Sequence, residues 1–322
     1  MWPLSKKGVS KSFLKLKSRK TIIEEIVRRF RGVTGEENVL FVVDKAQAGV
    51  LRVTFKHLPA RNVIVEPFGR NTASAVGLAA VKAAPDDILV IMPTDALIED
   101  GKKFRQAVTR AVDFVQGCEG KIVCIGVEPT EAATAYGYIK ILRPLGHGIY
   151  CVDKFVEKPS PAMARKFVSE KRYLWNAGIF VARAKDILAA MKKHAPKLYK
   201  KLDIIRRHPS RTAKAYAAMK NRSIDYQLLE KMDDLYCVRA DFKWIDIGNW
   251  VSMAGLYGKS SSGNAKFGDV HFIDTSDSFV YNSGTTPIGV LGMDNVVIVR
   301  TNNGVLVCGK EYAQRVRDLE LI

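Results

Sequence analysis

The first half of the chain alternates amphipathic segments with short apolar runs. Residues 21–30 and 102–115 carry apolar side chains at helical spacing, so we predict a helix in each. Short runs rich in β-branched residues predict buried strands, and they lie at residues 38–43, 62–66, 88–92 and 121–127. Strands that alternate with helices predict an α/β fold, with a parallel sheet covered by helices on both faces.

The pattern changes after residue 127. Residues 135–141 and 149–157 alternate apolar and polar positions like antiparallel strands, and the Leu-Gly-His-Gly sequence at 145–148 predicts the turn between them. Residues 175–182 predict one more strand. Helical patterns then dominate residues 185–232.

The last part of the chain is different again. Beyond about residue 262, short apolar runs are separated by Asp, Asn, Ser and Gly. This composition is typical of a small β-solenoid or a sandwich-like tail. We therefore predict two domains, residues 1–262 and residues 263–322.

The net charge of +18 is concentrated in two segments. Residues 1–31 hold ten Lys and Arg against two Glu, and residues 192–222 hold eleven against one Asp, which accounts for the whole excess. Neither segment has the interleaved aromatics or the recognition motif of a nucleic-acid binder, so we expect no nucleic-acid partner. The remaining interpretations are two solvated basic surfaces, or a field that attracts nucleotides and sugar phosphates.

The composition also bears on cellular location. The sequence has neither an apolar run of about 18 residues nor an apolar signal region near its start, so we expect no membrane association and a cytoplasmic protein. The five cysteines are scattered without a Cys-x-x-Cys pair, which indicates free thiols in a reducing compartment. The five histidines show no metal-ligand spacing.

Two aspartates are candidate metal ligands. Asp95 follows the apolar run at 88–92, and ligands of open α/β sheets collect at the carboxyl ends of such strands. The alternative is that Asp95 only makes a turn or caps the next segment. Asp246 lies in a second acidic loop beside Gly248. If the fold brings both carboxylates together, they form an all-oxygen site that suits Mg²⁺, whose shell is usually completed by substrate phosphates.

Four other polar residues suit phosphate and sugar groups. Lys11 and Lys158 are natural partners of phosphate oxygens. Glu157 supplies an acceptor, and Asn176 supplies an amide that both donates and accepts, as sugar hydroxyls require. The alternative for each is a surface polar residue at a strand end.

A series of motifs extends along nearly the whole chain. In order, they are Trp2-Pro-Leu-Ser5 with Lys11-Ser-Phe-Leu14, Glu66-Pro-Phe-Gly-Arg-Asn-Thr-Ala73, Pro93-Thr-Asp95, Tyr136-Gly-Tyr-Ile139, Phe155-Val-Glu-Lys-Pro159, Trp175-Asn-Ala-Gly178, Ser223-Ile-Asp-Tyr226 and Trp244-Ile-Asp-Ile-Gly-Asn-Trp250. Together they resemble the successive motifs of mannose-1-phosphate guanylyltransferases, also called GDP-mannose pyrophosphorylases. The second and seventh motifs are more specific to this branch, whereas Glu-Lys-Pro and Asn-Ala-Gly are shared by sugar nucleotidyltransferases generally.

The resemblance implies a fold and an activity. The fold is a Rossmann-like nucleotidyltransferase domain with a mixed, mostly parallel sheet, followed by a short left-handed β-helix-like domain. The activity is Mg²⁺-dependent transfer of GMP from GTP to mannose 1-phosphate, which gives GDP-mannose and pyrophosphate. The alternatives are a nucleotidyltransferase for another nucleoside triphosphate or hexose 1-phosphate, and a non-catalytic regulatory subunit. The oligomeric state is open, with a homodimer as one option.

The resemblance also implies roles for individual residues. It places Mg²⁺ on Asp95 and Asp246. The residues implied in catalysis are Lys11, Lys158 and Asp95, those implied in nucleotide binding are Arg70, Asn71, Thr72 and Thr94, and those implied in sugar binding are Gly137, Glu157 and Asn176.

The sequence departs from the family pattern near its start. In the family, Trp-Pro-Leu-Ser follows a buried strand and a Gly-Gly-x-Gly-Thr-Arg loop that holds the triphosphate, whereas here Met1 directly precedes Trp2. We therefore expect the true start to lie upstream of Met1. A chain without the loop is expected to be poorly stable and close to inactive. Ser10 stands where the family usually has a proline before the lysine that Lys11 matches.

Overall fold

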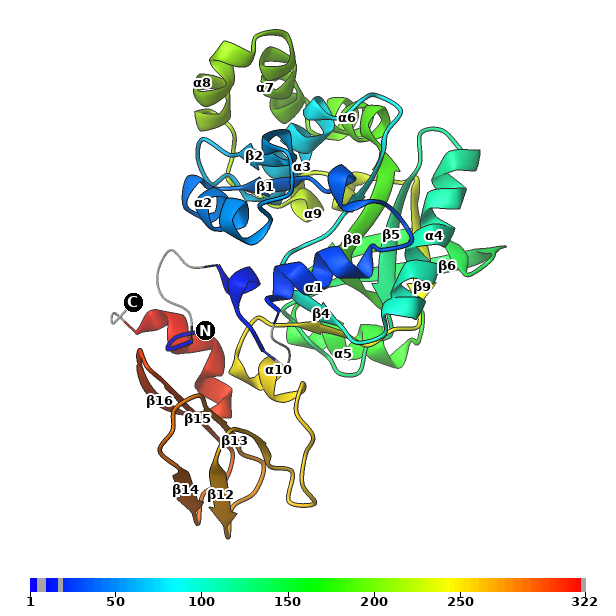
Figure 1. Ribbon diagram of the computed structural model, residues 1–322. Coiled ribbons are helices and arrows are strands. Elements are labelled where there is room, and N and C mark those ends of the chain that lie inside the picture. The colour runs from blue at the N-terminus through cyan, green and yellow to red at the C-terminus, as the bar shows by residue number, and fades with distance from the viewer. Residues whose placement is uncertain (5–9, 17–19, 320–322) are drawn as a thin grey trace. The chain divides into compact units, whose positions relative to one another are not determined.

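The computed structural model describes residues 1–4, 10–16 and 20–319 of the chain (Figure 1). Ser5, the last residue of the first motif, lies outside these residues. The chain forms two compact units, each assembled from separate stretches of sequence. The larger unit comprises Val27–Pro93 and Ile98–Lys243, and the smaller comprises Met1–Ile26, Thr94–Leu97 and Trp244–Ile322.

The larger unit contains most of the predicted helices and strands. Its helices are α2 (Lys45–Thr54), α3 (Asn71–Lys82), α4 (Gly101–Gly117), α5 (Pro161–Ser169), α6 (Ala184–His194), α7 (Pro196–Arg207), α8 (Thr212–Ala217) and α9 (Ile224–Gln227). Its strands are β1 (Phe41–Val43), β2 (Val63–Val65), β3 (Ile88–Ile91), β5 (Ile122–Val127), β6 (Gly137–Gly146), β7 (Ile149–Glu157), β8 (Tyr173–Arg183) and β9 (Leu235–Ala240). Sequence patterns did not predict α2 or β9.

Helix α1 (Ile22–Arg29) begins where the sequence predicts a helix. Thr21 and Glu24 cap it reciprocally: the Thr21 N–H donates to Glu24 Oε2 at 2.8 Å, and the Glu24 N–H donates to Thr21 Oγ1 at 3.3 Å. This arrangement satisfies two backbone donors that the first helical turn leaves without partners.

The main sheet of the larger unit is mixed, as predicted. Its six strands lie in the order β3-β8-β5-β9-β7-β6, with β6 also paired to β8. Strands β3, β5, β6 and β9 run in one direction, and β7 and β8 run in the other. Strand β8 lies between β3 and β5 and is antiparallel to both. Among neighbours in the strand order, β5 and β9 form the parallel pair. The prediction of a parallel sheet from strand–helix alternation was therefore too simple.

The strand at 88–92 also differs from its prediction as a buried parallel strand. Strand β3 pairs antiparallel with β8, with Ile88 opposite Arg183 and Ile91 opposite Phe180. Its four residues are half-buried, because β3 lies at the end of the strand order and has one neighbour in that sheet. Apolar content indicates a strand, but direction and position depend on how later segments return to the sheet.

Both faces of the main sheet are covered. On one face, Ile122, Cys124 and Phe180 join a core cluster that also contains buried residues of α3, α6 and α7. Helix α4 packs on β5, β8 and β9 through its own buried stripe (Figure 1). Burial on both sides explains why every residue of β5 is buried. No helix among the described residues is long and apolar enough to cross a membrane.

The smaller unit is built mainly from short strands. Strand β4 (Ala96–Ile98), which extends one residue into the larger unit, pairs with β10 (Trp244–Asp246), and α10 (Trp250–Ala254) follows. The remaining strands are β11 (Ala265–Phe267), β12 (Val270–Ile273), β13 (Phe279–Asn282), β14 (Ile288–Leu291), β15 (Val296–Thr301) and β16 (Gly304–Gly309).

The C-terminal strands form a solenoid-like ladder. Val270 pairs in parallel with Ile288, and Phe279 pairs in parallel with Val297, so both of these pairs are offset by 18 residues. Val270, Val280 and Val290 form a small core inside the ladder. This parallel stacking favours the predicted β-solenoid over a sandwich-like tail.

The first residues of the chain dock onto this ladder. The fully buried Trp250 donates its Nε1–H to the carbonyl oxygen of Trp2 at 2.9 Å. Thr301 Oγ1 and Asn303 Nδ2 both donate to the carbonyl oxygen of Pro3, at 3.0 and 3.1 Å. Gly304 allows this approach, because a Cβ there would lie 2.8 Å from the Trp2 ring.

A glycine in the main sheet provides a test of the core. A Cβ at Gly126 would lie 2.8 Å from Leu174 Cβ and 2.9 Å from Cys237 Sγ, so Gly126→Ala should lower the free energy of unfolding by about 1–3 kcal/mol through overpacking. Urea unfolding measures this change. The matched control is Gly117→Ala at the end of α4, where nothing lies within 4 Å and stability should stay the same or rise by about 0.4–1 kcal/mol. Equal effects of the two substitutions would contradict the described packing.

Candidate functional site

The two predicted metal ligands lie on neighbouring strand ends in the smaller unit. Asp95 directly precedes β4, and Asp246 ends β10, the strand that pairs with β4. The N–H of Ile247 donates to the carbonyl oxygen of Asp95 at 3.2 Å, so the backbones of the two acidic segments are in direct contact. Both aspartates are half-buried. Gly248 leaves room for the second carboxylate, because a Cβ there would lie 3.0 Å from Asp246 Oδ2.

Lys11 reaches the strand ends that carry Asp95 and Asp246, which are called the acidic end from here on. It lies in a short 3₁₀ helix, Lys11–Phe13, and its Nζ donates to the carbonyl oxygen of Gly248 at 3.1 Å. Beside it, the buried Ser12 donates its hydroxyl to Thr94 Oγ1 at 2.7 Å. Thr94, predicted to contact the nucleotide, therefore already accepts a hydrogen bond from the protein. Ser12 was missed as a member of this group, although its place next to Lys11 was a signal.

The donor set of this end fits a hard divalent cation. The described residues contain no group of three or more His, Cys, Asp and Glu side chains that could enclose a metal ion. Two carboxylates alone suit a cation that keeps several waters and binds substrate phosphates, as Mg²⁺ does. The donor set thus agrees with the divalent metal that the resemblance implies.

The three residues predicted to bind the sugar form a second cluster, in the larger unit. Gly137 of β6 lies opposite Glu157 of β7, and Asn176 lies on β8, which also pairs with β6. A Cβ at Gly137 would lie 2.5 Å from Glu157 Oε2 and 3.3 Å from Asn176 Cβ. The absence of a side chain at residue 137 is therefore what allows the carboxyl and the amide side chains to lie here.

The environment of Glu157 is unusual for a carboxylate. Its side chain is 10% exposed, and its backbone N–H donates to Glu230 Oε1 at 2.8 Å. Burial raises the pKa of Glu157 to about 7; the Asp225 carboxylate adds to the rise, and the Lys158 ammonium, 3.7 Å away, opposes it. Near neutral pH this side chain exists in both protonation states, so it can donate as well as accept.

Lys158 is held in a strained conformation. Its φ of +49° lies in the left-handed region, which non-glycine residues rarely adopt and which costs of order 1–3 kcal/mol. Its N–H donates to the carbonyl oxygen of Tyr136 at 3.2 Å, and Pro159 follows it. Such strain concentrates at functional sites. The Lys158 side chain remains 57% exposed, as a partner of substrate phosphate would be.

The segment predicted to meet the nucleotide forms the start of α3. Asn71 has a φ of +66°, and its Oδ1 accepts from the Thr72 N–H at 2.8 Å. Thr72 Oγ1 accepts from the N–H of Ile224 at 2.9 Å, and Arg70 Nη2 donates to the carbonyl oxygen of Ala217 at 2.6 Å. Both side chains are thus engaged with the protein. The Arg70 Nε is buried without a hydrogen-bond partner in the described structure.

Glu66 begins the same motif and anchors it. The hydroxyl of the fully buried Tyr216, on α8, donates to Glu66 Oε1. Burial raises the pKa of Glu66, while the bond from Tyr216 opposes the rise. The motif is therefore held against residues 192–222, the second of the two segments rich in Lys and Arg.

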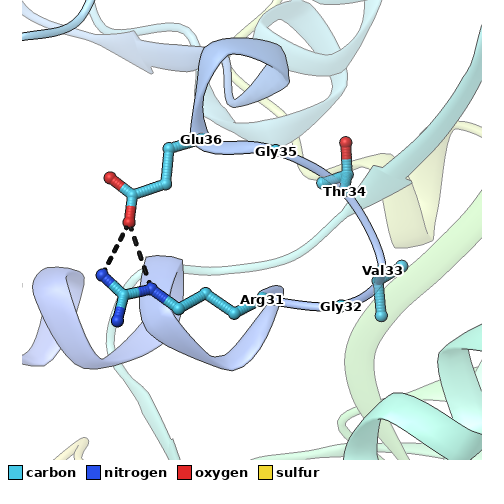
Figure 2. A pocket seen from close by; sticks show the side chains of 6 residues that line it. All are labelled: Arg31, Gly32, Val33, Thr34, Gly35 and Glu36. Atoms are coloured by element: carbon cyan, nitrogen blue, oxygen red, sulfur yellow. Dashed lines mark hydrogen bonds and ion pairs between the residues drawn. The ribbon is translucent and has the colours of Figure 1, made fainter.

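A surface hollow elsewhere does not belong to either cluster. It has a volume of about 500 Å³ and is lined by the continuous stretch from Arg31 to Glu36. Figure 2 shows the Arg31 guanidinium reaching across the turn to the Glu36 carboxylate, with Nη2 and Oε1 3.1 Å apart. A turn hollow without convergent groups from several elements is not a typical ligand site.

Comparison with known proteins supplies the family. The profile described as nucleotidyl transferase matches residues 1–258, which is most of the chain. The chain belongs to the nucleotidyl transferase family. A second profile, described as a MannoseP isomerase/GMP-like beta-helix domain, matches residues 268–319. These matches confirm the predicted combination of a nucleotidyltransferase domain and a β-helix-like domain, while the division between residues 262 and 263 stays a prediction.

Several relatives of this nucleotidyltransferase match nearly its whole chain. It is 31% identical to the alginate biosynthesis protein AlgA of Pseudomonas aeruginosa, over 98% of this chain and 68% of that protein. It is also 31% identical to the mannose-1-phosphate guanylyltransferase RfbM of Salmonella typhimurium, over 99% of this chain and 69% of that protein. A crystal structure of a mannose-1-phosphate geranyltransferase from Thermus thermophilus matches with a TM-score of 0.90 and 30% identity, over 99% of this chain and 94% of that chain.

The raised pKa of Glu157 gives a prediction for stability against pH. The folded-state pKa of about 7 exceeds the ordinary value of 4.5. The contribution of Glu157 to the free energy of unfolding is therefore largest below pH 4.5 and is lost as the pH rises to about 7. The gap corresponds to about 3 kcal/mol. Relative to the wild type, Glu157→Gln should therefore gain about this much unfolding free energy between about pH 4 and about pH 8 in urea titrations.

The control for this titration is Glu131→Gln, at an exposed position of the same unit. This surface substitution should change the free energy of unfolding by no more than about 0.5 kcal/mol. A Glu157→Gln difference that stays constant between about pH 4 and about pH 8 would contradict the described burial of the carboxyl.

Proposed function

We propose that this nucleotidyltransferase transfers GMP from GTP to mannose 1-phosphate and forms GDP-mannose and pyrophosphate. The family match, and the relative RfbM that is named a mannose-1-phosphate guanylyltransferase, support this choice of substrates. The observation that carries the proposal is the close group of Gly137, Glu157 and Asn176. A carboxyl and an amide directed to one place by a missing Cβ suit the neighbouring hydroxyls of a hexose.

In the proposed reaction, a phosphate oxygen of mannose 1-phosphate attacks the α-phosphorus of GTP. The new P–O bond forms while the bond from the α-phosphorus to the bridging oxygen breaks, and the electron pair leaves with pyrophosphate. No covalent bond to the protein is needed. The main obstacle is repulsion between two anions, so the protein acts through alignment and charge neutralisation.

Each proposed residue has a separate part in this chemistry. Lys158, exposed and fixed by its backbone, binds the phosphate of the sugar substrate. Lys11, beside the acidic loop, binds a phosphate of the nucleotide. Arg70, Asn71 and Thr72, at the start of α3, and Thr94, which precedes Asp95, are the other proposed nucleotide-binding residues.

Asp95 and Asp246 would hold Mg²⁺. When bound, the ion supplies positive charge that stabilises the phosphate oxygens during transfer. The two carboxylates fix its place through the pairing of β4 with β10, and Gly248 keeps the side of Asp246 open. Two half-buried carboxylates leave most of the coordination shell to water and substrate oxygens.

In sugar binding, Glu157 and Asn176 accept and donate hydrogen bonds. Because the pKa of Glu157 is close to 7, protonation replaces an acceptor by a donor within the physiological range. If the wrong epimer of a hexose leaves a buried polar group of the protein without a hydrogen-bond partner, its binding is weaker by up to several kcal/mol.

The substrate choice can be measured directly. With Mg²⁺ present, pyrophosphate release should be fastest with GTP and mannose 1-phosphate when GTP, ATP, UTP and dTTP are each tested with mannose, glucose and galactose 1-phosphates. Faster release with another pair would identify a different nucleotidyltransferase. No release with any pair, from this chain and from one extended upstream by the glycine-rich loop, would support a non-catalytic subunit instead.

The metal ligands give a second measurement. Asp95→Asn and Asp246→Asn should each lower kcat about a hundredfold, because each removes one preorganised stabilising group. Both should also raise the Mg²⁺ concentration needed for half-maximal rate. The matched control is Asp241→Asn, whose carboxylate is 92% exposed and pairs with Lys103, and it should retain wild-type kinetics. An unchanged Mg²⁺ dependence in both site variants would exclude this role.

A further inference from the structure

Asp225 belongs to a sequence motif to which the site assignment gave no role, yet it contacts a predicted sugar-binding residue. We propose that Asp225 is a positioning residue for mannose 1-phosphate, which acts by fixing the side-chain amide of Asn176. The inference rests on the proposed function and deepens it. Asp225 needs no contact with the substrate for this role.

The amide of Asn176 is held at both ends. Its Oδ1 accepts from the N–H of Gly178 at 3.0 Å, and its Nδ2 donates to Asp225 Oδ1 at 3.1 Å. Asn176 is 8% exposed. The two ends of a primary amide have nearly the same shape, so hydrogen-bond partners decide which way it points. With both partners present, one N–H and one acceptor lone pair remain, each in a known direction.

The short helix that carries Asp225 is itself anchored to the nucleotide segment. Asp225 is the second residue of α9, and the first, Ile224, donates its N–H to Thr72 Oγ1. Ile224 and Leu228 are buried in the core of the larger unit, which prevents α9 from shifting. One four-residue helix therefore contacts both Asn176 and the start of α3. The two substrates are proposed to meet these same segments, so the position of α9 sets the distance between them.

The charges around Asp225 explain why a carboxylate suits this place. The charged groups that act on Glu157 are Asp225, Lys158 and Glu230, and those that act on Asp225 include Lys158 and Glu230. Burial raises the pKa of Asp225, and the Lys158 ammonium opposes the rise. An ionised carboxylate only accepts hydrogen bonds, so it always selects the NH₂ end of Asn176. A residue with its own donor could hold the amide in either sense.

The test compares Asp225→Ala, Asn176→Ala and the double variant. Pyrophosphate release is measured at saturating GTP with mannose 1-phosphate varied, and then with GTP varied. Asp225→Ala should raise KM for mannose 1-phosphate at least tenfold and change KM for GTP less than threefold. Because Asp225 acts through Asn176, the double variant should be no worse than Asn176→Ala alone. A KM within twofold of wild type for Asp225→Ala, or effects that multiply in the double variant, would overturn the proposal.

Two further variants separate positioning from general stability. Asp225→Asn keeps the shape and an acceptor oxygen but adds a donor that can hold the amide the other way round, so KM for mannose 1-phosphate should lie between those of Asp225→Ala and the wild type. Removing the charge should also lower the apparent pKa in the pH profile of kcat/KM for mannose 1-phosphate, and an unchanged profile would contradict the inference even if Asp225→Ala does not fold. Asp233→Ala, exposed in the following loop, is the matched control and should behave like the wild type.

The outcome for the wild type distinguishes the two proposals. If the wild type does not turn over GTP and mannose 1-phosphate, the proposed function fails and the role of Asp225 fails with it. If the wild type turns over and Asp225→Ala does the same with unchanged KM, only the role of Asp225 is wrong.

Discussion

The pairing of β4 with β10 is the constraint on which the acidic end of the protein depends. Each strand has only three residues, and they come from distant parts of the sequence. Their alignment places Asp95 and Asp246 at adjacent strand ends and lets Lys11 reach the Gly248 carbonyl oxygen. Short strands contribute few hydrogen bonds, so the surrounding unit must hold them. The buried Trp250 next to β10, with its bond to the Trp2 carbonyl oxygen, supplies part of that support.

The cluster of Gly137, Glu157 and Asn176, proposed to bind the sugar, follows a different electrostatic rule. At the acidic end, half-buried carboxylates are suited to an added cation. In the larger unit, Glu157 and Asp225 are carboxyl groups with raised pKa values that lie near one lysine. Burial and repulsion favour the protonated form of Glu157 near neutral pH, so it could bind a hydroxyl of the proposed sugar substrate without carrying full negative charge towards its phosphate. The proposed metal site thus needs ionised carboxylates, whereas the proposed sugar site needs a carboxyl that is partly protonated.

Much of the fold could be predicted from the sequence, because periodicity reports which residues are buried. Periodicity could not give the direction of β3, because that direction depends on β8, which comes much later in the sequence and pairs with β3. The solenoid spacing was hidden as well: Ala265 pairs with Phe279 and Phe279 with Val297, so the first offset differs from the next. Few turns with unequal offsets leave no measurable repeat in the sequence.

The sequence supplied candidate residues for the site but not their contacts. Asp95, Glu157 and Asn176 were recognisable from motif and residue type. The partner of Thr72 is the N–H of Ile224, and a backbone group leaves no trace in side-chain identity. Asp225 was visible as part of a motif, yet its contact with Asn176 depends on where α9 packs. Long-range packing, rather than local preference, decides such contacts.

The docking of Trp2 and Pro3 onto the β-ladder has a consequence for synthesis. These residues leave the ribosome 248 to 300 residues before their partners Trp250, Thr301 and Asn303. The sheet of the larger unit can assemble in the meantime, since its strands lie between residues 88 and 240. The positive charge of the first 31 residues opposes association between nascent chains while that segment waits. Vectorial synthesis therefore lets the docking of Trp2 and Pro3 follow the assembly of that sheet.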